Sequence, residues 1–100
     1  MSTYLVAFIV SDYEFVKLET ETNSVTRTKP DDVEHRVYAR REYTRNGDGV
    51  YAVVCGKIAL DAIVDFVDVE YSLKKMDQAA IPEDYFGAGA MENWGLVTYR

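Results

Sequence analysis

Several residue types that define common classes of protein are nearly absent from this chain of 100 residues. It has one cysteine, Cys55, so no internal disulfide can form and the redox compartment stays open. It has one histidine, His35. The longest apolar run, Tyr4 to Val10, is too short to cross a bilayer and follows no basic segment. The sequence therefore predicts neither a transmembrane helix nor a signal peptide.

Basic residues are also in the minority, with 11 Lys and Arg against 17 Asp and Glu and a net charge of −6. This balance argues against nucleic acid as a partner, because binding to phosphates requires a basic face. A hydrophobic content of 48% with 13% aromatic residues is typical of a globular chain. The length suits one small domain or a piece of a larger one. The eight tyrosines suit half-buried sheet positions better than a dedicated binding surface.

The first forty residues favour β-strands. Residues 4–10 are apolar at every position, which predicts a strand covered on both faces. Residues 13–20 and 33–41 alternate, and His35, Val37 and Ala39 share one face of the second of these segments. Between them, residues 21–32 are polar and rich in turn-forming types. We expect the two segments to pair as an antiparallel hairpin.

A helix and further strands are expected after the loop Asn46-Gly47-Asp48-Gly49. The helix covers about residues 50–67. A narrow polar stripe recurs every four residues, and apolar residues line the opposite side, so the helix is expected to be mostly buried with one wet edge. The stripe comprises Lys57, Asp61 and Asp65, and the apolar side comprises Ala52, Cys55, Ala59, Ala62, Ile63 and Phe66. Strands are expected at about 76–81 and 96–100, with a loop at 83–87. The fold class is therefore α+β, with a mixed or antiparallel sheet and one mostly buried helix.

Residues 89–95 read G-A-M-E-N-W-G and contain the one carboxylate in this stretch, Glu92. The α-amino group of a peptide has a pKa of about 7.7–8.0 and is mostly cationic at neutral pH. A carboxylate fixed in a dry cleft can recognise that ammonium by a charge-assisted hydrogen bond. Small residues at Gly89 and Ala90 would let a substrate backbone approach the strand edge. Taken alone, a glutamate between Met91 and Asn93 is more often a surface carboxylate than an ammonium clamp.

The full string from Gly89 to Arg100, G-A-M-E-N-W-G-L-V-T-Y-R, resembles the exopeptidase signature of the M1 (gluzincin) zinc aminopeptidases, of the aminopeptidase N-like type. The stretch M-S-T-Y-L-V-A-F at residues 1–8 is similar to one that this family carries at the matching distance. V-Y-A-R at 37–40, K-M-D at 75–77 and I-P at 81–82 follow in the same order. The resemblance therefore runs through the whole chain and is strongest at its two ends.

The resemblance implies a zinc metallopeptidase that removes amino acids from peptide N-termini. Residues 1–12 would be the terminal strand of an upstream β domain, and residues 13–100 the first, incomplete half of a thermolysin-like catalytic domain. Residues 89–93 would form a strand along one wall of the cleft, where Glu92 takes the substrate α-ammonium. The substrate-binding residues implied are Ala88, Gly89, Ala90, Met91, Glu92 and Asn93, with Ala88 near the first side-chain pocket and Gly89 and Ala90 offering backbone groups.

No metal site is expected within the chain itself. The family binds zinc through H-E-x-x-H and a later glutamate, and neither element occurs here. No zinc is therefore expected to be bound by these residues, and no catalytic residue is expected among them. His35 suits a packed or solvated strand position, and Cys55 a small core residue. Asp61 and Asp65 suit a solvated stripe, and Asp31, Asp32 and Glu34 suit turn chemistry better than a cation site.

Two functional hypotheses follow. The first is a segment of a zinc aminopeptidase that binds peptide N-termini together with the remainder of the catalytic domain, and that is inactive alone. The second is a non-catalytic binding module or receptor fragment derived from such an enzyme. An H-E-x-x-H downstream of Arg100 would favour the first hypothesis, and a stop codon the second. The residues leave location undecided, although the resemblance is compatible with the extracellular face of the plasma membrane.

Overall fold

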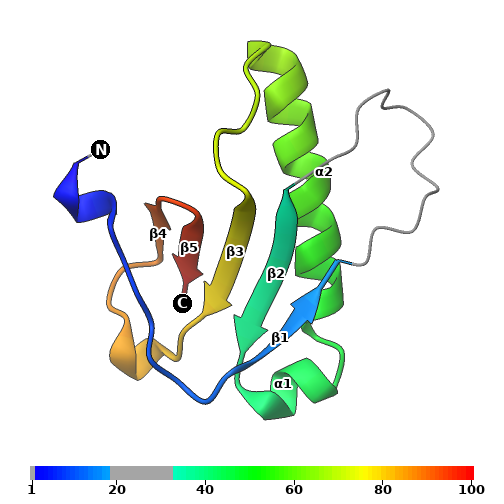
Figure 1. Ribbon diagram of the computed structural model, residues 1–100. Helices are drawn as coiled ribbons and strands as arrows, with labels where there is room; N and C mark the ends of the chain where they lie inside the picture. Colours follow the sequence, from blue (N-terminus) through cyan, green and yellow to red (C-terminus); the bar gives the residue numbers. More distant parts are fainter. Residues whose placement is uncertain (1, 19–32) are drawn as a thin grey trace.

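The computed structural model describes residues 2–18 and 33–100 and contains a mixed sheet with helices beside it (Figure 1). The strands run in the order β1-β2-β3-β5-β4. Two short 3-10 helices, η1 and η2, lie before β1 and between β3 and β4. The elements, in chain order, are η1 Thr3–Leu5, β1 Glu14–Lys17, β2 Glu34–Ala39, α1 Arg41–Arg45, α2 Gly49–Val67, β3 Lys75–Ala80, η2 Glu83–Tyr85, β4 Ala90–Asn93 and β5 Leu96–Tyr99. The predicted α+β fold with a mixed sheet is confirmed.

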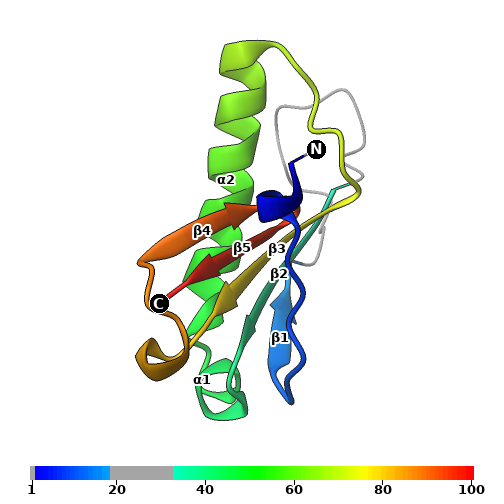
Figure 2. The same cartoon turned by 90° about the vertical axis from the view of Figure 1, so that its left-hand side faces the viewer.

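The order of the strands explains why one helix is needed in the middle of the chain. β2 and β3 are parallel neighbours, so the chain must cross back over the sheet between them, and α2 makes this crossover. β1 pairs with β2, and β4 with β5, in antiparallel fashion. The predicted antiparallel pairing of the second and third segments is confirmed over four residues on each strand. Figure 2 shows α2 on one face of the sheet and residues 2–12 on the other.

The small core lies between α2 and the strands beneath it. His35, Val37 and Ala39 alternate along β2 with half-buried or exposed neighbours, and all three are buried, as their spacing predicts. On β3, Gln78 shares the α2 face and its amide donates to the backbone oxygen of Ala52 at 3.3 Å. Ala79, on the opposite face, is fully buried. The core therefore forms around β2 and β3, two of the three strands that have neighbours on both sides.

The helix was predicted within one residue, but its burial was predicted wrongly. Only Val53 of its 19 residues is buried. The polar stripe at Lys57 and Asp61 is half-buried, with an ion pair of 2.6 Å, whereas Ile63 and Phe66 are exposed. The period of the apolar residues located the helix correctly. However, this helix is apolar around most of its circumference, so the pattern did not identify the side that meets the sheet.

The strand predicted at residues 4–10 is also not formed. Thr3–Leu5 is a 3-10 helix, and residues 6–10 carry no strand pairing. Tyr4, Phe8 and Val10 are exposed, so the expected cover on both faces is absent among the described residues. The segment is tied to the sheet at Leu5, whose carbonyl oxygen accepts the Trp94 N–H at 2.8 Å. An all-apolar run fits a buried strand only where both of its faces find partners.

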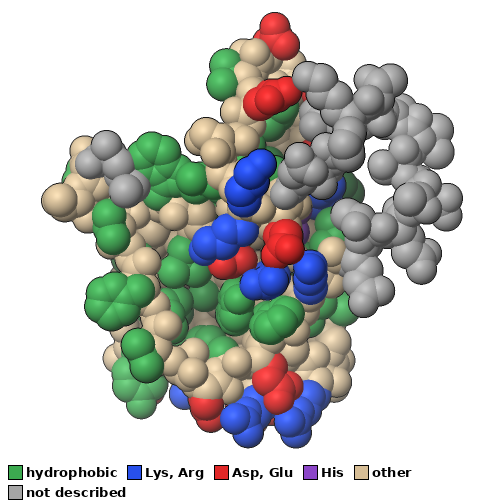
Figure 3. All heavy atoms as spheres, viewed as in Figure 1, with side chains coloured by type: hydrophobic (Ala, Val, Ile, Leu, Met, Phe, Trp, Pro, Cys, Tyr) green, Lys and Arg blue, Asp and Glu red, His purple; other side chains and the backbone are tan. Residues whose placement is uncertain are grey.

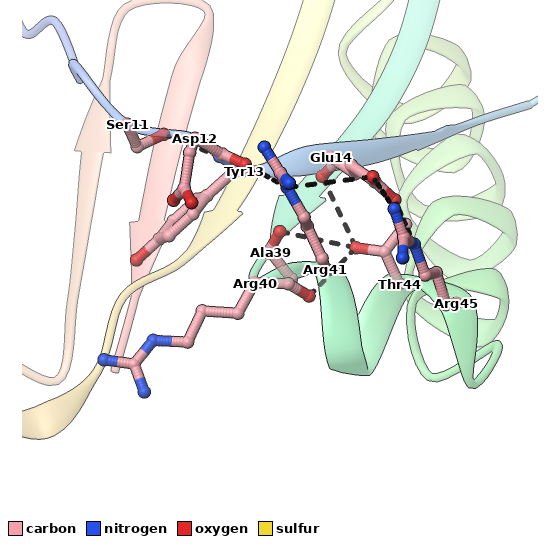
Figure 4. A network of polar contacts seen from close by, with 9 residues as sticks. All are labelled: Ser11, Asp12, Tyr13, Glu14, Ala39, Arg40, Arg41, Thr44 and Arg45. Carbon is pink, nitrogen blue, oxygen red and sulfur yellow. Dashed lines mark hydrogen bonds and ion pairs between the residues drawn. The ribbon is translucent and has the colours of Figure 1, made fainter.

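A helix that the sequence did not predict, α1, follows β2 and is held by β1 (Figure 4). Arg45 donates to both carboxylate oxygens of Glu14, at 2.7 and 3.2 Å. Arg41 donates to the backbone oxygen of Asp12 at 3.2 Å, and the Thr44 hydroxyl lies 3.4 Å from the backbone oxygens of Glu14 and Ala39. Five residues are too few for a stable isolated helix, so these contacts across the chain stabilise it. The expected loop is reduced to a turn at residues 46–48.

Charged side chains gather over the middle of the sheet face that carries residues 2–12 (Figure 3). Glu34 pairs with Lys17 at 3.4 Å and with Arg36 at 2.8 Å, and Lys75 pairs with Asp77 at 2.7 Å. The predicted polar stretch 21–32, with Asp31 and Asp32, and the end of the second predicted strand at residues 19–20 lie outside the described residues. Within the described ranges, no helix has the length and apolar character needed to cross a bilayer.

Candidate functional site

The six candidate residues in and next to the G-A-M-E-N motif lie on, or just before, β4, the strand at one edge of the sheet. Ala90 to Asn93 form β4, and Ala88 and Gly89 form the bend that leads into it. β4 has a neighbour, β5, on one side only. Within the described chain no strand pairs with its other edge, although η1 contacts β4 and the Leu5 carbonyl oxygen accepts the N–H of the adjoining Trp94. An edge without a paired strand can take up an added extended peptide.

Alternation along β4 separates the candidate residues into two groups. Glu92 is paired with Val97, which is paired with Gln78, so Glu92 points to the face of the sheet that carries α2. Ala90 shares this face. Met91 and Asn93 point to the opposite face, toward residues 2–12, and Asn93 is only 8% exposed. The strand therefore points the Asn93 side chain toward residues 2–12, where it is buried, and the Glu92 side chain toward the face that carries α2, where it is exposed.

The side chains of β4 and β5 that face residues 2–12 fix the position of this strand. The Asn93 amide donates to the Thr98 hydroxyl on β5 and to the Met91 carbonyl oxygen, both at 3.4 Å. Thr98 is buried as well. β4 and β5 are joined by a two-residue turn, Trp94-Gly95, in which Gly95 has a φ of +74°. Only the second turn residue is left-handed, as in a type II turn, and glycine is the residue that adopts this conformation without steric cost.

Hydrogen bonding within the sheet determines which backbone groups of the motif remain free. The Gly89 carbonyl oxygen accepts the Arg100 N–H at 3.0 Å, in register with the β4–β5 pairing. Because bonded and non-bonded pairs alternate in an antiparallel ladder, Met91 and Asn93 also face β5 with their backbone groups. The N–H and C=O groups of Ala90 and Glu92 then point to the open edge. Ala90 is thus placed to offer backbone groups to a peptide, whereas the Gly89 carbonyl is already used.

The Glu92 side chain is exposed, and no hydrogen bond or ion pair joins it to the described residues. α2 packs mainly on β1 and β2, at the other end of the sheet. A free carboxylate beside an open strand edge can accept hydrogen bonds from a cation held in an extended peptide. The arrangement of β4 can therefore fix a peptide by its backbone and recognise a positive group beside it.

A cavity of about 290 Å³ lies on the other face of the sheet. Its walls include Tyr13 from the segment before β1, Tyr38 from β2, and Asp77 from β3. Since Asp77 and Glu92 point to opposite faces, this cavity is separate from the open edge that Glu92 flanks.

The other candidate residues do not form a chemical site. His35 is 2% exposed and lies within the sheet, as the packed interpretation predicts. Cys55 is half-buried on α2. Glu34 pairs with Lys17 and Arg36. Among the residues that the structure describes, no group of three or more His, Cys, Asp or Glu side chains is placed to hold a metal ion.

Comparison with known proteins identifies the family. A sequence model described as the "Peptidase family M1 domain" matches residues 51–100, which include most of α2, the strands β3, β4 and β5, and all six candidate residues. The chain is 46% identical over its whole length to aminopeptidase N of Bos taurus, 42% identical to glutamyl aminopeptidase of Sus scrofa, and 43% identical to endoplasmic reticulum aminopeptidase 1 of Homo sapiens. The chain belongs to peptidase family M1.

The M1 chain spans 9% of the length of these relatives. All three relatives are aminopeptidases, so the region derives from an aminopeptidase family. The sequence analysis did not predict that Asn93 and Thr98 are buried and hydrogen-bonded to each other. The alternation of residues 90–99 around Trp94-Gly95 would have indicated it, because a two-residue hairpin fixes which side chains share a face.

Proposed function

We propose that the M1 protein containing these residues is a zinc-dependent aminopeptidase that removes amino acids from peptide N-termini, and that Glu92 takes the substrate α-ammonium. The observation that carries the proposal is the position of Glu92: an exposed carboxylate on the edge strand of an M1 chain, next to outward-facing backbone groups. A peptide paired with β4 would bring its first residue past this carboxylate.

The carboxylate also explains a preference for the first peptide bond. An internal segment of a peptide has no ammonium, so its binding would leave Glu92 without a partner once the cleft excludes water. Leaving one member of a buried charge pair unmatched costs about 3–5 kcal/mol, or roughly a hundred- to several-thousand-fold in rate. This difference is large enough to make the enzyme an exopeptidase.

Zinc would supply the hydrolytic chemistry in the longer protein by polarising the scissile carbonyl and activating water. The described residues do not fit a zinc centre, since no suitable cluster exists among them and His35 is buried in the sheet. We propose that the ligands come from other parts of the polypeptide. The role of residues 1–100 is to bind and orient the peptide, and alone they are proposed to be inactive.

The division of the chain at about residue 12 is also part of this proposal. Residues 2–12 contribute no strand to the sheet, although η1 contacts β4, whereas all five strands lie within residues 13–100. We assign residues 1–12 to the end of an upstream domain and residues 13–100 to the first half of the peptidase domain. Ala88, at the bend before β4, borders the pocket for the first side chain.

The test is Glu92→Gln in the full-length protein, with Glu83→Gln, an exposed carboxylate on η2, as the matched control. We expect kcat/KM on peptides with a free N-terminus to fall about 100-fold or more for the first variant, because the charge pair is lost. Zinc content should stay near that of the unchanged protein. Glu83→Gln should retain its activity. Unchanged activity of Glu92→Gln would remove Glu92 from this role. Peptide binding without hydrolysis by the unchanged protein would favour the binding-module hypothesis.

A further inference from the structure

One backbone group, the carbonyl oxygen of Gly95, ties the turn between β4 and β5 to strand β3. It accepts the backbone N–H of Asp77 at 3.1 Å and the side-chain ammonium of Lys75, also at 3.1 Å. On the other side of the turn, the Trp94 N–H donates to the Leu5 carbonyl oxygen at 2.8 Å. These three hydrogen bonds hold the turn in place, and Lys75 contributes the one that comes from a side chain.

The Lys75 ammonium is itself directed by Asp77, two residues further along β3. The Lys75 Nζ atom lies 2.7 Å from Asp77 Oδ2. The Asp77 side chain is only 9% exposed, whereas the Lys75 side chain is 48% exposed. The second carboxylate oxygen, Oδ1, accepts no hydrogen bond from any residue that the structure describes. A carboxylate buried in this way attracts its cation more strongly than an exposed one. Asp77 therefore restricts the Lys75 side chain to the geometry that reaches Gly95.

The turn is also the fixed point next to Glu92. Glu92 lies two residues before Trp94, on a strand of four residues whose one paired strand in the described chain is β5. The pair of Asn93 and Leu96 closes the turn. A displacement of Gly95 is therefore passed to Glu92 through a single ladder of hydrogen bonds. A misplacement of about 1 Å can reduce the rate of an enzyme about 100-fold.

We infer that Lys75, directed by Asp77, is a positioning residue: through the Gly95 carbonyl it sets the place at which Glu92 meets the substrate α-ammonium. This inference rests on the proposed function, in which Glu92 takes that ammonium. Lys75 and Asp77 act on the substrate only through the backbone, because their side chains lie on the face of the sheet opposite Glu92. Loss of the Lys75 ammonium weakens the recognition of the α-ammonium and leaves the contacts of the remaining substrate in place.

The experiment compares two inhibitors of the full-length, zinc-loaded protein: leucine hydroxamate, and the same molecule without its α-amino group. Both carry the same metal-binding group, and only the first offers an ammonium to Glu92. The ratio of their inhibition constants therefore measures ammonium recognition, and a smaller folded fraction does not change it. We expect the unchanged protein to prefer the first inhibitor about 100-fold or more. Glu92→Gln should reduce this preference to near one.

Lys75→Met should lower the preference about tenfold or more, since the turn loses a donor and Asp77 loses its cation. Lys74→Met, at the adjacent exposed lysine, is the matched control and should keep the preference within about twofold. Lys75→Arg retains the charge and the donors, so its preference should stay within about threefold of the unchanged protein. Val53→Ala, in the core between α2 and the sheet, controls for a general loss of stability and should also keep the preference.

Amide hydrogen exchange in the full-length protein gives a second readout that needs no catalysis. Lys75→Met should speed exchange at the N–H groups of Trp94 and Asp77 about tenfold or more, because these groups hydrogen-bond at the turn that loses its side-chain contact. Lys74→Met should leave both rates unchanged. Unchanged exchange in Lys75→Met would overturn the inference.

The outcomes separate the inference from the proposed function. A preference that Glu92→Gln abolishes and Lys75→Met leaves intact would overturn the inference, while the role of Glu92 stands. An equal loss in Val53→Ala would also overturn it, because the effect would then follow stability rather than position. A preference that Glu92→Gln leaves unchanged would remove the ammonium from Glu92, and the inference would fall together with that part of the proposed function.

Discussion

Two glutamates of this chain show how the surroundings of a side chain decide its use. Glu14 accepts two hydrogen bonds from Arg45 and lies 3.8 Å from Arg41, so its charge is used within the fold. Glu92 has no such partner among the described residues and stands at an open strand edge. In the sequence the two residues look alike. Only the pairing of distant segments, residue 14 with residue 45, distinguishes the structural carboxylate from the available one.

The ion pair between Glu14 and Arg45 makes the unfolding free energy depend on pH. The hydrogen bonds from Arg45, and then the charges of Arg45 and Arg41, hold the pKa of Glu14 below its ordinary value of 4.5. A lowered pKa means that this contribution is present above the unfolded-state pKa and is lost as the pH falls through the folded-state pKa. We expect Glu14→Gln to be less stable than the unchanged protein at pH 7, and the difference to shrink as the pH falls below about 4.5. Urea unfolding at a series of pH values measures it. A difference that is constant with pH would contradict this.

A second prediction at this scale concerns Gly56, where α2 approaches β3. A Cβ at this position would overlap the Gln78 amide, which donates to the Ala52 oxygen. Gly56→Ala should lower the unfolding free energy by about 1 kcal/mol because this hydrogen bond is lost, and raise it by about 1 kcal/mol because alanine has the higher helix propensity. The net change in unfolding free energy is therefore near zero. In a Gln78→Ala background the same substitution should stabilise by about 1 kcal/mol. Urea unfolding of the four proteins tests this cycle. Equal effects in the two backgrounds would show that Gln78 does not restrict this position.

At the scale of elements, α2 shows what periodicity predicts and what it does not. The start and length of the helix were predicted within one residue. Its orientation was predicted wrongly, because Ile63 and Phe66 are exposed while Lys57 and Asp61 are half-buried. A helix that is apolar on two sides has two nearly equivalent ways to lie on a sheet. The choice depends on the close approach at Gly56 and on the crossover from β2 to β3, neither of which is encoded in the helix alone.

The β4–β5 hairpin that carries Glu92 depends on Gly95. Its φ of +74° disfavours any residue with a Cβ, and that atom would also lie 3.0 Å from Leu73 Cδ1. We expect Gly95→Ala to lower the unfolding free energy by about 1–2 kcal/mol. Gly87→Ala is the control, because no atom lies within 4 Å of its Cβ position. It should change stability by less than about 0.5 kcal/mol. Thermal unfolding of both variants makes the comparison, and equal stabilities would exclude strain at Gly95.

At the scale of the whole molecule, the sequence predicted the sheet better than its surroundings. Alternation and turn residues predicted the β1–β2 pairing, the buried face of β2, and strands near residues 75–80 and 96–99. α1 was missed, since its five residues are held by contacts with β1 rather than by their own pattern. The candidate residues on β4 were proposed from a resemblance. Which of them point outward depends on the pairing with β5, a relation between two strands.

The last prediction concerns a polypeptide of these 100 residues alone. It exposes Tyr51, Ile58 and Phe66 on α2, and it exposes Tyr4, Phe8 and Val10 in the segment on the other face of the sheet. Burial of one such side chain is worth about 1.5–3 kcal/mol, so we expect the polypeptide to self-associate. Phe66→Ser and Phe8→Ser should each weaken the association about tenfold or more. Tyr85→Ser, an exposed aromatic outside both surfaces, should leave it unchanged. Sedimentation equilibrium gives the association constants. A monomer with a sharp two-state thermal transition would show that the sheet and its core are sufficient without added cover, and that the exposed apolar residues need no partner.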